Sequence, residues 1–450
     1  MQIKQFEDKN LSHYSYAILS DCEKKIILID PARNAKQYFD YAKENDALIT
    51  GIIETHPHAD FVSSHLELHQ TIGATIYTSK DVHALYPHQA FDEGQTIQLS
   101  KIKLTALNTP GHSPDSISIL LEHEGKQKAV FTGDTLFIGD CGRPDLREGA
   151  GKIQTTRTEL ARQMYHSLRN KLMKLEDDVT VYPAHGAGTL CGKNLSKERS
   201  STIGEEKKTN WSLQEATEEK FVQNLLADQP FVPHYFPYDV ELNRKGVAGF
   251  KDSIAKVKIS GTAAEDKTSA LDKALWIIDT RNEEEFKKGH VPHSINLMEE
   301  GKFETWLGSI IKPEEKFYLV SDSQEQLQTM LERTGAIGYE SQVAEGFVID
   351  CGIVKEEKIN VDEFKNHQQD YTIVDVRNTS EVKEGKIFKS SISIPLSEIR
   401  NRVAEIPTDK PIVVHCAGGY RSAAASSLIH AQLDGTVKVF DLGEAIKKFQ

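Results

Sequence analysis

Short apolar runs alternate with polar turns from residue 1 to about residue 200. The runs are rich in β-branched side chains and have the length of single strands, so the pattern predicts β-strands. Helical patterns lie between some of the runs, at 61–73 and 159–175. Strands with interspersed helices predict a layered α/β domain. The strand-like runs are KKIILID (24–30), ALITGIIET (47–55), KLTALNT (103–109), SISILLE (116–122), AVFTGD (129–134) and VTVYPAH (179–185).

The pattern changes after residue 195. A polar stretch at 196–220 predicts a loop followed by a helix. The segment FVPHYFPYDV at 231–240 combines proline with aromatic residues and predicts an ordered segment at the end of the domain. We therefore expect the first domain to span residues 1–240.

The rest of the chain contains an internal repeat with a period of about 95 residues. The segment WIIDTRNEEEFKKGHVPHSINL at 276–297 matches TIVDVRNTSEVKEGKIFKSSISIPL at 372–396, and both contain Asp-x-Arg. Each copy has apolar strands separated by helices, which predicts a parallel α/β sheet. We expect these two domains at 245–350 and 355–450.

Composition narrows the class of protein. The chain has 450 residues, 38% of them hydrophobic and 27% charged, with a net charge of −13. This charge argues against a nucleic-acid or anionic-membrane partner. The N-terminus lacks the apolar region of a secretory signal, and no apolar run reaches the roughly 18 residues of a membrane span. We expect a cytoplasmic protein with free thiols, because its five scattered cysteines do not resemble a disulfide framework.

Polar clusters follow four of the predicted strands. A strand end can place such side chains on one edge of a sheet, and imidazoles and carboxylates are ligands for zinc or iron. Any one of these histidines alone would be read as a loop residue, but the four clusters together favour a metal site. The residues are His56, His58 and Asp60, then His112, Asp134 and His185.

The motifs THPHAD, TPGHS, TGD and PAHG resemble the metallo-β-lactamase superfamily. The resemblance implies an αββα sandwich with its metal at one edge, followed here by two further α/β domains. The two-metal hydrolases of that superfamily usually continue the first motif as H-x-H-x-D-H. This chain has Phe61 in place of the last histidine. Phenylalanine cannot bind a metal, so a standard second metal site is not expected.

The persulfide dioxygenase branch of the superfamily holds one Fe(2+). The resemblance implies His56, His112 and Asp134 as its ligands. Two histidines and one carboxylate form the facial triad of non-haem iron oxygenases, which leaves places for O₂ and a persulfide. His58, Asp60 and His185 would orient ligands or substrate, or else serve as loop residues.

The segment GDCGRPDLREG at 139–149 resembles a Cys-Gly-Arg-x-Asp stretch of the same branch. Arg143 is expected either to bind an anionic part of the substrate or to form an ion pair with Asp145. Cys141 and Cys191 lie near these motifs, and each is interpreted as a buried inert thiol.

The second repeat copy contains HCAGGYRSAAASSLI at 415–429, after a predicted strand. Cys416 and Arg421 resemble the rhodanese active loop, in which four residues separate cysteine from arginine. A helix N-terminus, the backbone N–H groups of Gly418 and Gly419, and the Arg421 charge are expected to stabilise the thiolate, the nucleophilic form.

The first copy resembles the rhodanese family upstream of its loop but not within it. Ser321 and Gln326 stand where Cys416 and Arg421 stand in the second copy. A serine without a base is a poor nucleophile, so this domain is predicted to be degenerate and non-catalytic. Cys351, between the copies, has no motif around it and is predicted to be structural.

Taken together, the modules resemble bacterial persulfide dioxygenase–sulfurtransferase fusions that act in sulfide detoxification. The resemblance implies oxidation of a thiol persulfide by O₂ to sulfite, with Cys416 moving sulfane sulfur. The direction of this transfer stays open: Cys416 passes sulfur either from a persulfide to sulfite, forming thiosulfate, or from a donor to the carrier thiol that supplies the iron site. Glutathione, coenzyme A and bacillithiol all remain as carrier thiols, and a homo-oligomer is expected. Two alternatives stay open: a zinc-dependent thioester hydrolase of the glyoxalase II kind fused to a rhodanese, and a non-catalytic persulfide carrier.

Overall fold

The computed structural model describes residues 1–147, 155–193, 195–262, 268, 270–350 and 352–450. Cys351 lies outside the described residues, so its predicted structural role stays a prediction. The chain forms two compact units. The first comprises Met1–Asp252 with Ala336–Gly338, and the second comprises Ser253–Gly335 with Tyr339–Gln450.

Two six-stranded sheets form the centre of the first unit. One sheet has the order β1 (Gln2–Asp8), β2 (His13–Ser20), β3 (Lys25–Ile29), β4 (Leu48–Ile53), β5 (Thr75–Thr78) and β6 (Gln89–Ala90). The other has the order β12 (Ser201–Thr202), β11 (Thr180–Pro183), β10 (Lys126–Gly133), β9 (Ile117–His123), β8 (Ile102–Asn108) and β7 (Thr96–Leu99).

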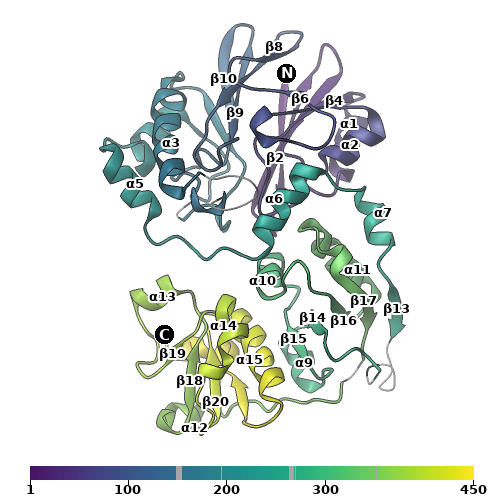
Figure 1. The fold of residues 1–450 in the computed structure, drawn as a ribbon, viewed down its shortest axis with the longest axis vertical. Coiled ribbons are helices and arrows are strands. Elements are labelled where there is room, and N and C mark those ends of the chain that lie inside the picture. The colour runs from purple at the N-terminus through teal and green to yellow at the C-terminus, as the bar shows by residue number, and fades with distance from the viewer. Residues whose placement is uncertain (148–154, 194, 263–267, 269, 351) are drawn as a thin grey trace. The chain divides into compact units, whose positions relative to one another are not determined.

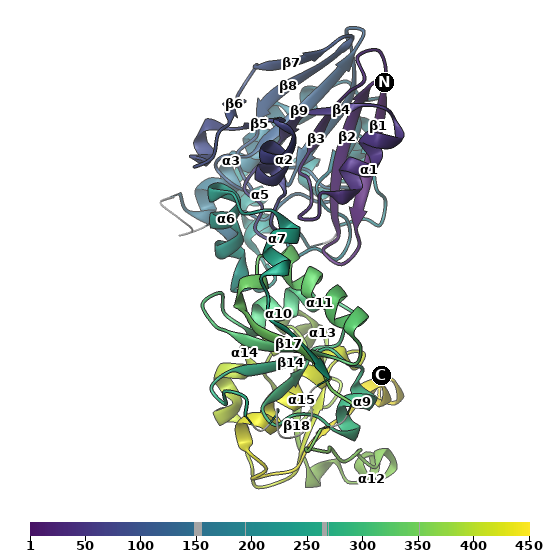
Figure 2. The ribbon, with the colours of Figure 1, turned by 90° about the vertical axis from the view of Figure 1, so that its right-hand side faces the viewer.

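Helices cover the outer faces of these sheets. In Figure 1, α1 and α2 lie on one side of the sheets and α3 and α5 lie on the other, and Figure 2 shows α1 and α2 in front of the first sheet. The helices of this unit are α1 (Lys36–Glu44), α2 (His65–Ile72), α3 (Arg157–Asn170), α4 (Ile203–Thr209), α5 (Glu218–Leu226), α6 (Tyr235–Lys245) and α7 (Phe250–Ala255), the last of which runs into the second unit.

The alternation of side chains along β2 explains the layering. Tyr16 and Ile18 belong to the core between the two sheets, whereas Ala17 and Leu19 belong to the core beneath α1 and α2. Successive strand residues point to opposite faces, so a strand that is apolar at every position must be covered on both sides. The αββα sandwich is therefore confirmed in the first unit.

The segments after residue 195 are more regular than their sequence pattern predicts. The stretch 196–220 contains β12, α4 and the start of α5, and α6 begins inside 231–240. Thr202 and Thr217 accept backbone N–H hydrogen bonds at the starts of α4 and α5. These caps are short polar signals that a hydrophobic pattern does not reveal.

The second unit contains two parallel sheets, one for each copy of the repeat. The first has the order β13 (Ile259–Thr262), β17 (Val343–Val348), β16 (Phe317–Ser321), β14 (Trp276–Asp279) and β15 (Ser294–Asn296). The second has the order β19 (Ile392–Ser393), β18 (Thr372–Asp375), β20 (Ile412–His415) and β21 (Val439–Asp441). The helices are α9 (Glu283–Lys288), α10 (Phe303–Ile310), α11 (Gln324–Ala336), α12 (Val361–Asn366), α13 (Thr379–Glu384), α14 (Leu396–Arg402) and α15 (Tyr420–Leu433).

The strand register makes Ser321 the structural equivalent of Cys416. The last residue of β14 lies opposite Val320, and the last residue of β18 lies opposite His415. The next residue along the chain is Ser321 in the first copy and Cys416 in the second. The two loops therefore leave their sheets at the same point.

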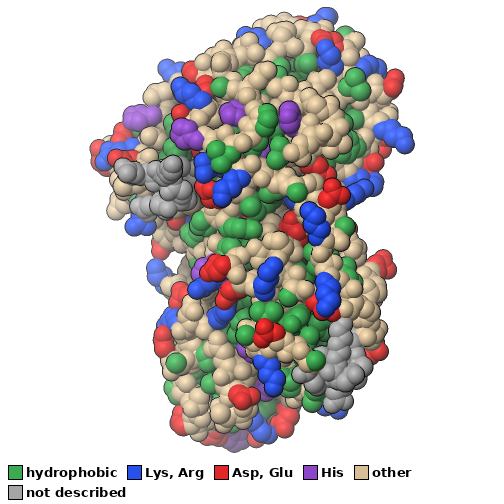
Figure 3. Space-filling view, turned by 45° about the vertical axis from the view of Figure 1, so that its right-hand side comes forward, with side chains coloured by type: hydrophobic (Ala, Val, Ile, Leu, Met, Phe, Trp, Pro, Cys, Tyr) green, Lys and Arg blue, Asp and Glu red, His purple; other side chains and the backbone are tan. Residues whose placement is uncertain are grey.

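Among the helices in the described parts of the chain, none combines the length and apolar character needed to cross a bilayer. On the face drawn in Figure 3, lysine and arginine side chains lie intermixed with aspartate and glutamate. The acidic net charge is therefore not accompanied by one large basic area on that face.

Candidate functional site

The strand ends of the first unit bring the predicted metal ligands together. His56 follows β4, His112 follows β8, Asp134 directly follows β10, and His185 follows β11. Strands β8, β10 and β11 run in the same direction, because β9 is antiparallel to β8 and β10 and β11 is parallel to β10. Their C-terminal ends therefore meet at one edge of the sheet.

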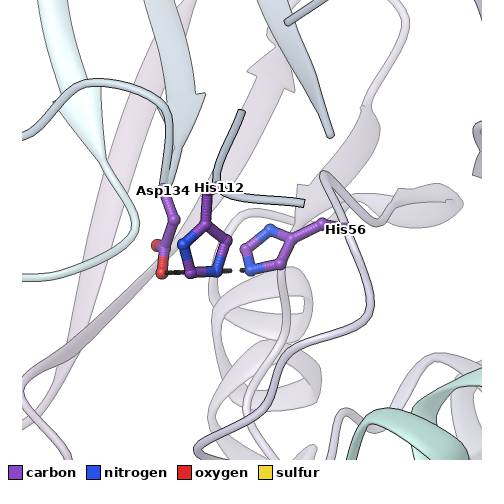
Figure 4. A group of neighbouring side chains, drawn as sticks. All are labelled: His56, His112 and Asp134. Carbon is purple, nitrogen blue, oxygen red and sulfur yellow. Dashed lines mark ion pairs between the residues drawn. The ribbon is translucent and has the colours of Figure 1, made fainter. Parts of the chain in front are cut away.

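His56, His112 and Asp134 form one compact buried group (Figure 4). The Nε2 atoms of His56 and His112 lie 3.9 and 3.5 Å from Oδ2 of Asp134. Each residue is at most 2% exposed. Neither carboxylate oxygen of Asp134 has a hydrogen-bond partner among the described residues. A buried carboxylate without hydrogen bonds is costly unless it binds a cation, so this donor set fits a metal ion.

Hydrogen bonds behind the two rings fix which nitrogen faces the site. Nδ1 of His112 lies 2.9 Å from the carbonyl oxygen of Arg143, to which it must donate its proton. Nδ1 of His56 lies 3.0 Å from Oγ1 of Thr55, and Thr55 donates to Oδ2 of Asp30 at 2.8 Å. Both rings therefore present the lone pair of Nε2 to the site, which is the form that binds a metal.

Gly142 passes directly behind this group. A Cβ atom at position 142 would lie 2.0 Å from the backbone oxygen of Asp134 and 3.0 Å from Nδ1 of His112. Only glycine can make this close approach, which accounts for the glycine in the Cys-Gly-Arg stretch.

His185 and Asp60 border the triad. Nε2 of His185 lies 3.4 Å from Oδ2 of Asp60 and 3.5 Å from Oδ1 of Asp134, and Nδ1 of His185 lies 3.2 Å from the carbonyl oxygen of Ser12. Burial raises the pKa of Asp60. The structure thus brings Asp60 and His185 beside the candidate ligands, and their orienting role stays a prediction.

His58 turns toward a separate pair of carboxylates. Its Nε2 lies 3.2 Å from Oδ1 of Asp30 and 3.6 Å from Oε2 of Glu54. Burial alone would lower the pKa of His58, but the two carboxylates outweigh burial and raise the pKa to about 9. The ligand atom of His58 also lies within 4.8 Å of those of Asp60 and His185.

The structure also identifies residues that the motifs did not single out. Asp30 contacts Thr55 and His58, and Glu54 accepts a hydrogen bond from Ser63 at 2.7 Å. Asp30 ends the apolar run 24–30, so a polar residue at the end of a buried strand was the available signal. Glu54 gave no comparable signal because it precedes the histidine motif inside the run 47–55.

Phe61 occupies the place where two-metal relatives carry a histidine. It is 1% exposed, and its ring centroid lies 4.3 Å from that of His58 and 3.9 Å from that of His13. The aromatic packing fills the space beside His58 with carbon. This side of the site therefore lacks the ligand that a standard second metal position uses.

The guanidinium of Arg143 uses all its N–H donors in hydrogen bonds within the protein. Its Nε and Nη2 donate to Asp145 at 2.7 and 2.6 Å, and Nη1 and Nη2 also donate to the carbonyl oxygens of Leu190, Phe231 and Pro230. All five N–H groups of the guanidinium are thereby used. This geometry corresponds to the ion-pair alternative and leaves no donor for a substrate, so the substrate-binding role of Arg143 is not supported.

The other cysteines near these motifs are buried. Cys141 and Cys191 are each 1% exposed, and burial raises the pKa of both thiols well above the ordinary value. Cys141 belongs to the hydrophobic core beneath α3 and α5. Cys191 lies close to Asp134 and His185.

In the second unit, Cys416 lies at the base of a loop between β20 and α15. It is 2% exposed, and its Sγ accepts a hydrogen bond from the N–H of Gly419 at 3.1 Å and lies 3.7 Å from Oγ of Ser422. Gly419 has φ +109°, a conformation that favours glycine. The N–H of Gly418 does not donate a hydrogen bond to Sγ of Cys416. Of the two expected backbone donors, only the N–H of Gly419 therefore contacts the sulfur.

Arg421 does not bond to the sulfur in this structure. Its guanidinium forms a bidentate ion pair with Glu381, at 2.5 and 2.9 Å. Burial alone would lower the pKa of Arg421, but the bonds to Glu381 outweigh burial and raise that pKa. Glu381 thus holds the Arg421 charge at the rim of the loop.

The equivalent loop of the first copy has no thiol and no arginine. Oγ of Ser321 lies 2.7 Å from Oγ1 of Thr280, and Nε2 of Gln326 donates to Glu299 at 3.0 Å. Ser321 is buried, and the structure shows no base beside it among the described residues. The geometry agrees with the predicted non-catalytic character of this copy.

Comparisons with known proteins match both parts of the chain. The metallo-beta-lactamase superfamily model matches residues 10–185. The structure of a metallo-beta-lactamase from Staphylococcus aureus subsp. aureus COL is 30% identical, with a TM-score of 0.68, over 77% of this chain and 98% of that one. The chain belongs to the metallo-β-lactamase superfamily.

The rhodanese-like domain model matches residues 263–355 and 360–450, so two rhodanese-like domains follow the metallo-β-lactamase domain. The predicted fold class and order of modules are confirmed.

Curated relatives of the metallo-β-lactamase domain include hydrolases as well as persulfide dioxygenases. Hydroxyacylglutathione hydrolase GloC from Haemophilus influenzae is 29% identical over 43% of this chain and 90% of its own length. Mitochondrial persulfide dioxygenase ETHE1 from Mus musculus is 27% identical over 44% of this chain and 72% of its own length. Identity of this size does not choose between them. The choice depends on the residues of the metallo-β-lactamase domain itself.

Proposed function

We propose that this protein oxidises thiol persulfides with O₂ at one ferrous ion in the metallo-β-lactamase domain and transfers sulfane sulfur at Cys416. The observation that carries the proposal is the packing of Phe61 on His58, beside a triad of two histidines and one carboxylate. This triad, together with a phenylalanine at the position of the last histidine of the H-x-H-x-D-H pattern, favours a single metal with vacant coordination places.

The ligands would be Nε2 of His56, Nε2 of His112 and the carboxylate of Asp134. A ferrous ion held by these residues would supply open coordination positions and redox chemistry for O₂ and the persulfide. Thr55 and the carbonyl oxygen of Arg143 hold the rings in the metal-binding orientation. His185, whose Nε2 lies 3.5 Å from Oδ1 of Asp134, would contact an anionic group of the substrate.

The overall reaction of the first domain is RSSH + O₂ + H₂O → RSH + SO₃²⁻ + 2 H⁺. The terminal sulfur loses four electrons and O₂ gains them, and the carrier thiol leaves unchanged. The substrate is a low-molecular-weight persulfide, with the persulfides of glutathione, coenzyme A and bacillithiol as candidates. Burial of the triad keeps bulk water from the reacting sulfur.

The proposed role of Cys416 is to form thiosulfate. Its thiolate takes the outer sulfur of a persulfide: RSSH + Cys416–S⁻ → RS⁻ + Cys416–SSH. Sulfite then removes that sulfur: Cys416–SSH + SO₃²⁻ → Cys416–SH + S₂O₃²⁻. The N–H of Gly419 stabilises negative charge on Sγ in both steps, because it already points at the sulfur.

Oxygen consumption by the iron-loaded full-length chain tests the first activity. With at least one of the three persulfides we expect O₂ uptake matched by sulfite plus thiosulfate, and we expect the His112→Ala chain to lose it. Absence of uptake with all three persulfides, together with a metal content of one iron per chain, would reject the dioxygenase.

A second candidate is a two-zinc thioester hydrolase. His58, Asp60 and His185 offer ligand atoms within 4.8 Å of one another, and hydroxyacylglutathione hydrolases are among the relatives. The carboxylates of Asp30 and Glu54 oppose this alternative because they favour a protonated His58. Hydrolysis of S-lactoylglutathione by a chain holding two zinc ions, without O₂ uptake, would favour the hydrolase.

A further inference from the structure

A second group of metal-ligand residues lies in the rhodanese-like unit. His290, Glu356 and His430 each offer a ligand atom, and these atoms all lie within 4.8 Å of one another. His290 follows α9 in the first rhodanese-like domain, and His430 lies on α15, the helix that follows the Cys416 loop. Glu356 lies in the short connection between the two matched segments, 263–355 and 360–450. Each of three parts of this unit thus contributes one residue.

The backbone holds His290 and Glu356 in place. His290 and Val354 exchange two backbone hydrogen bonds, of 2.9 and 3.0 Å, and the N–H of Glu356 donates to the carbonyl oxygen of Lys287 at 3.1 Å. The connection is therefore fastened to the end of α9. Glu356 faces the imidazoles because of this pairing.

His290 is oriented as a metal ligand. Its Nδ1 donates to the carbonyl oxygen of Phe286 at 3.1 Å, and its ring stacks on that of Phe286 with centroids 3.9 Å apart. The lone pair is therefore on Nε2, the nitrogen that is free to bind an ion. Burial lowers the pKa of His290 to about 4, so the ring is neutral at neutral pH.

Glu356 carries a buried oxygen that nothing in the described chain satisfies. Its Oε1 has no hydrogen-bond partner. The nearby cation, Lys287, bonds to Asp441 at 2.9 Å and to Glu283 at 3.3 Å instead. Burial raises the pKa of Glu356 to about 7. A carboxyl group in this situation, next to two imidazoles, gains most from a divalent cation.

We propose that His290, Glu356 and His430 bind one zinc ion that joins the two rhodanese-like domains. Two imidazoles and one carboxylate are a common zinc set, with water as the fourth ligand. Tetrahedral ligands at about 2.1 Å from zinc lie roughly 3.4 Å apart. Zinc binding would draw the half-buried side chains of Glu356 and His430 to that spacing, while the stack on Phe286 holds His290.

The proposed zinc site gives the first rhodanese-like domain a function, although its loop lacks the cysteine and arginine of the second copy. Zinc would tie the connection and the first domain to α15, whose first turn carries Arg421 and follows Cys416. The ion would therefore stiffen the helix on which the sulfur-transfer loop is built. This inference goes beyond the proposed function and does not depend on iron or on O₂ chemistry.

Zinc titration of the full-length chain tests the site. The His56→Ala/His112→Ala chain, which lacks two ligands of the first site, is titrated with zinc in competition with a chromophoric chelator. We expect one zinc per chain. His430→Gln and Glu356→Gln, each added to this chain, should weaken zinc binding at least about tenfold. His367→Gln is the matched control, because His367 is an exposed histidine of the same unit.

Hydrogen exchange supplies a second measurement that does not depend on stoichiometry. Zinc should slow exchange of the backbone amides around 288–292 and 428–432 in the parent and His367→Gln chains, but not in the two ligand variants. The zinc-free exchange pattern shows whether each variant is folded, and Glu356→Gln keeps the size of the side chain. A parent chain that binds no zinc, or equal zinc affinity in all variants, overturns the proposal.

Discussion

The ring of Phe61 packs on the imidazole of His58, with centroids 4.3 Å apart, and His58 lies beside His56 of the triad. Nε2 of His58 lies 3.2 Å from Oδ1 of Asp30 and 3.6 Å from Oε2 of Glu54. In the proposed function, the aromatic side chain of Phe61 favours a single metal over a pair of metals. The remaining triad keeps its Nε2 atoms directed at Asp134.

Replacing Phe61 by histidine should restore a second metal position. The new imidazole completes the H-x-H-x-D-H pattern and removes the carbon that fills the space. We expect zinc content to rise from one to two ions in the metallo-β-lactamase domain and O₂ uptake to fall at least tenfold. Metal analysis in the Glu356→Gln background excludes the zinc proposed for the rhodanese-like unit. Phe61→Leu is the control, and a gain of metal in that chain would contradict the explanation.

Thr55 is predicted to act on the metal through His56. Thr55→Val removes the acceptor of the His56 Nδ1 proton and the bond to Asp30. Loss of such a bond behind a ligand typically lowers metal affinity 10- to 100-fold. Competition with an iron chelator measures the change.

Thr78→Val is the matched control for Thr55→Val. Thr78 is also buried at a strand end, but its Oγ1 has no hydrogen-bond partner in the described chain. This change should leave iron affinity within about twofold and stability nearly unchanged. Equal losses of iron in both variants would show that Thr55 acts through general packing and not through His56.

Cys416→Ser should separate the two proposed activities. Serine lacks a nucleophilic thiolate, so no sulfur can be carried on the loop. We expect O₂ uptake to stay near the wild-type rate while the product shifts from thiosulfate to sulfite. Anion chromatography of the products measures the ratio. Ser321→Ala, at the equivalent position of the first copy, should leave the ratio unchanged, and an unaltered ratio in Cys416→Ser would argue against a second active loop.

The ion pair between Glu381 and Arg421 should give the second rhodanese-like domain a pH-dependent stability. Burial alone would raise the pKa of Glu381, but the bonds from Arg421 outweigh burial and lower that pKa below the ordinary value. A lowered folded-state pKa stabilises the fold above the unfolded pKa of about 4.3. That contribution is lost as pH falls through the folded pKa.

Glu381→Gln checks this pH dependence. The difference in thermal stability between the wild type and Glu381→Gln should be constant near neutral pH and disappear in acid, below about pH 4. Glu285→Gln is the control, because Glu285 holds the equivalent place in the first copy but pairs with the exposed Lys288. A difference that grows as pH falls would have the wrong sign and would refute the argument.

Strand periodicity was sufficient to predict a layered α/β domain, and polar residues at strand ends were sufficient to predict a metal site. The αββα sandwich and the choice of His56, His112 and Asp134 came from the resemblance of the motifs to the metallo-β-lactamase superfamily. Each of those residues follows a buried strand, and parallel strands end at a common edge. The position of each residue just after a strand therefore indicated that the three side chains lie close together. The repeat likewise placed Ser321 and Cys416 at equivalent positions, which the strand register reproduces. For such features the sequence by itself was enough.

Tertiary structure alone decided the partners of the charged groups. Nothing in the sequence near Arg143 indicates that three distant carbonyl groups use its remaining donors, and nothing near Arg421 indicates Glu381. The same holds for His290 and His430, which are 140 residues apart in the chain and share one group of ligand atoms. The physical reason is that hydrogen bonds and ion pairs depend on distances of a few ångströms between side chains, which packing sets after the strands and helices have formed.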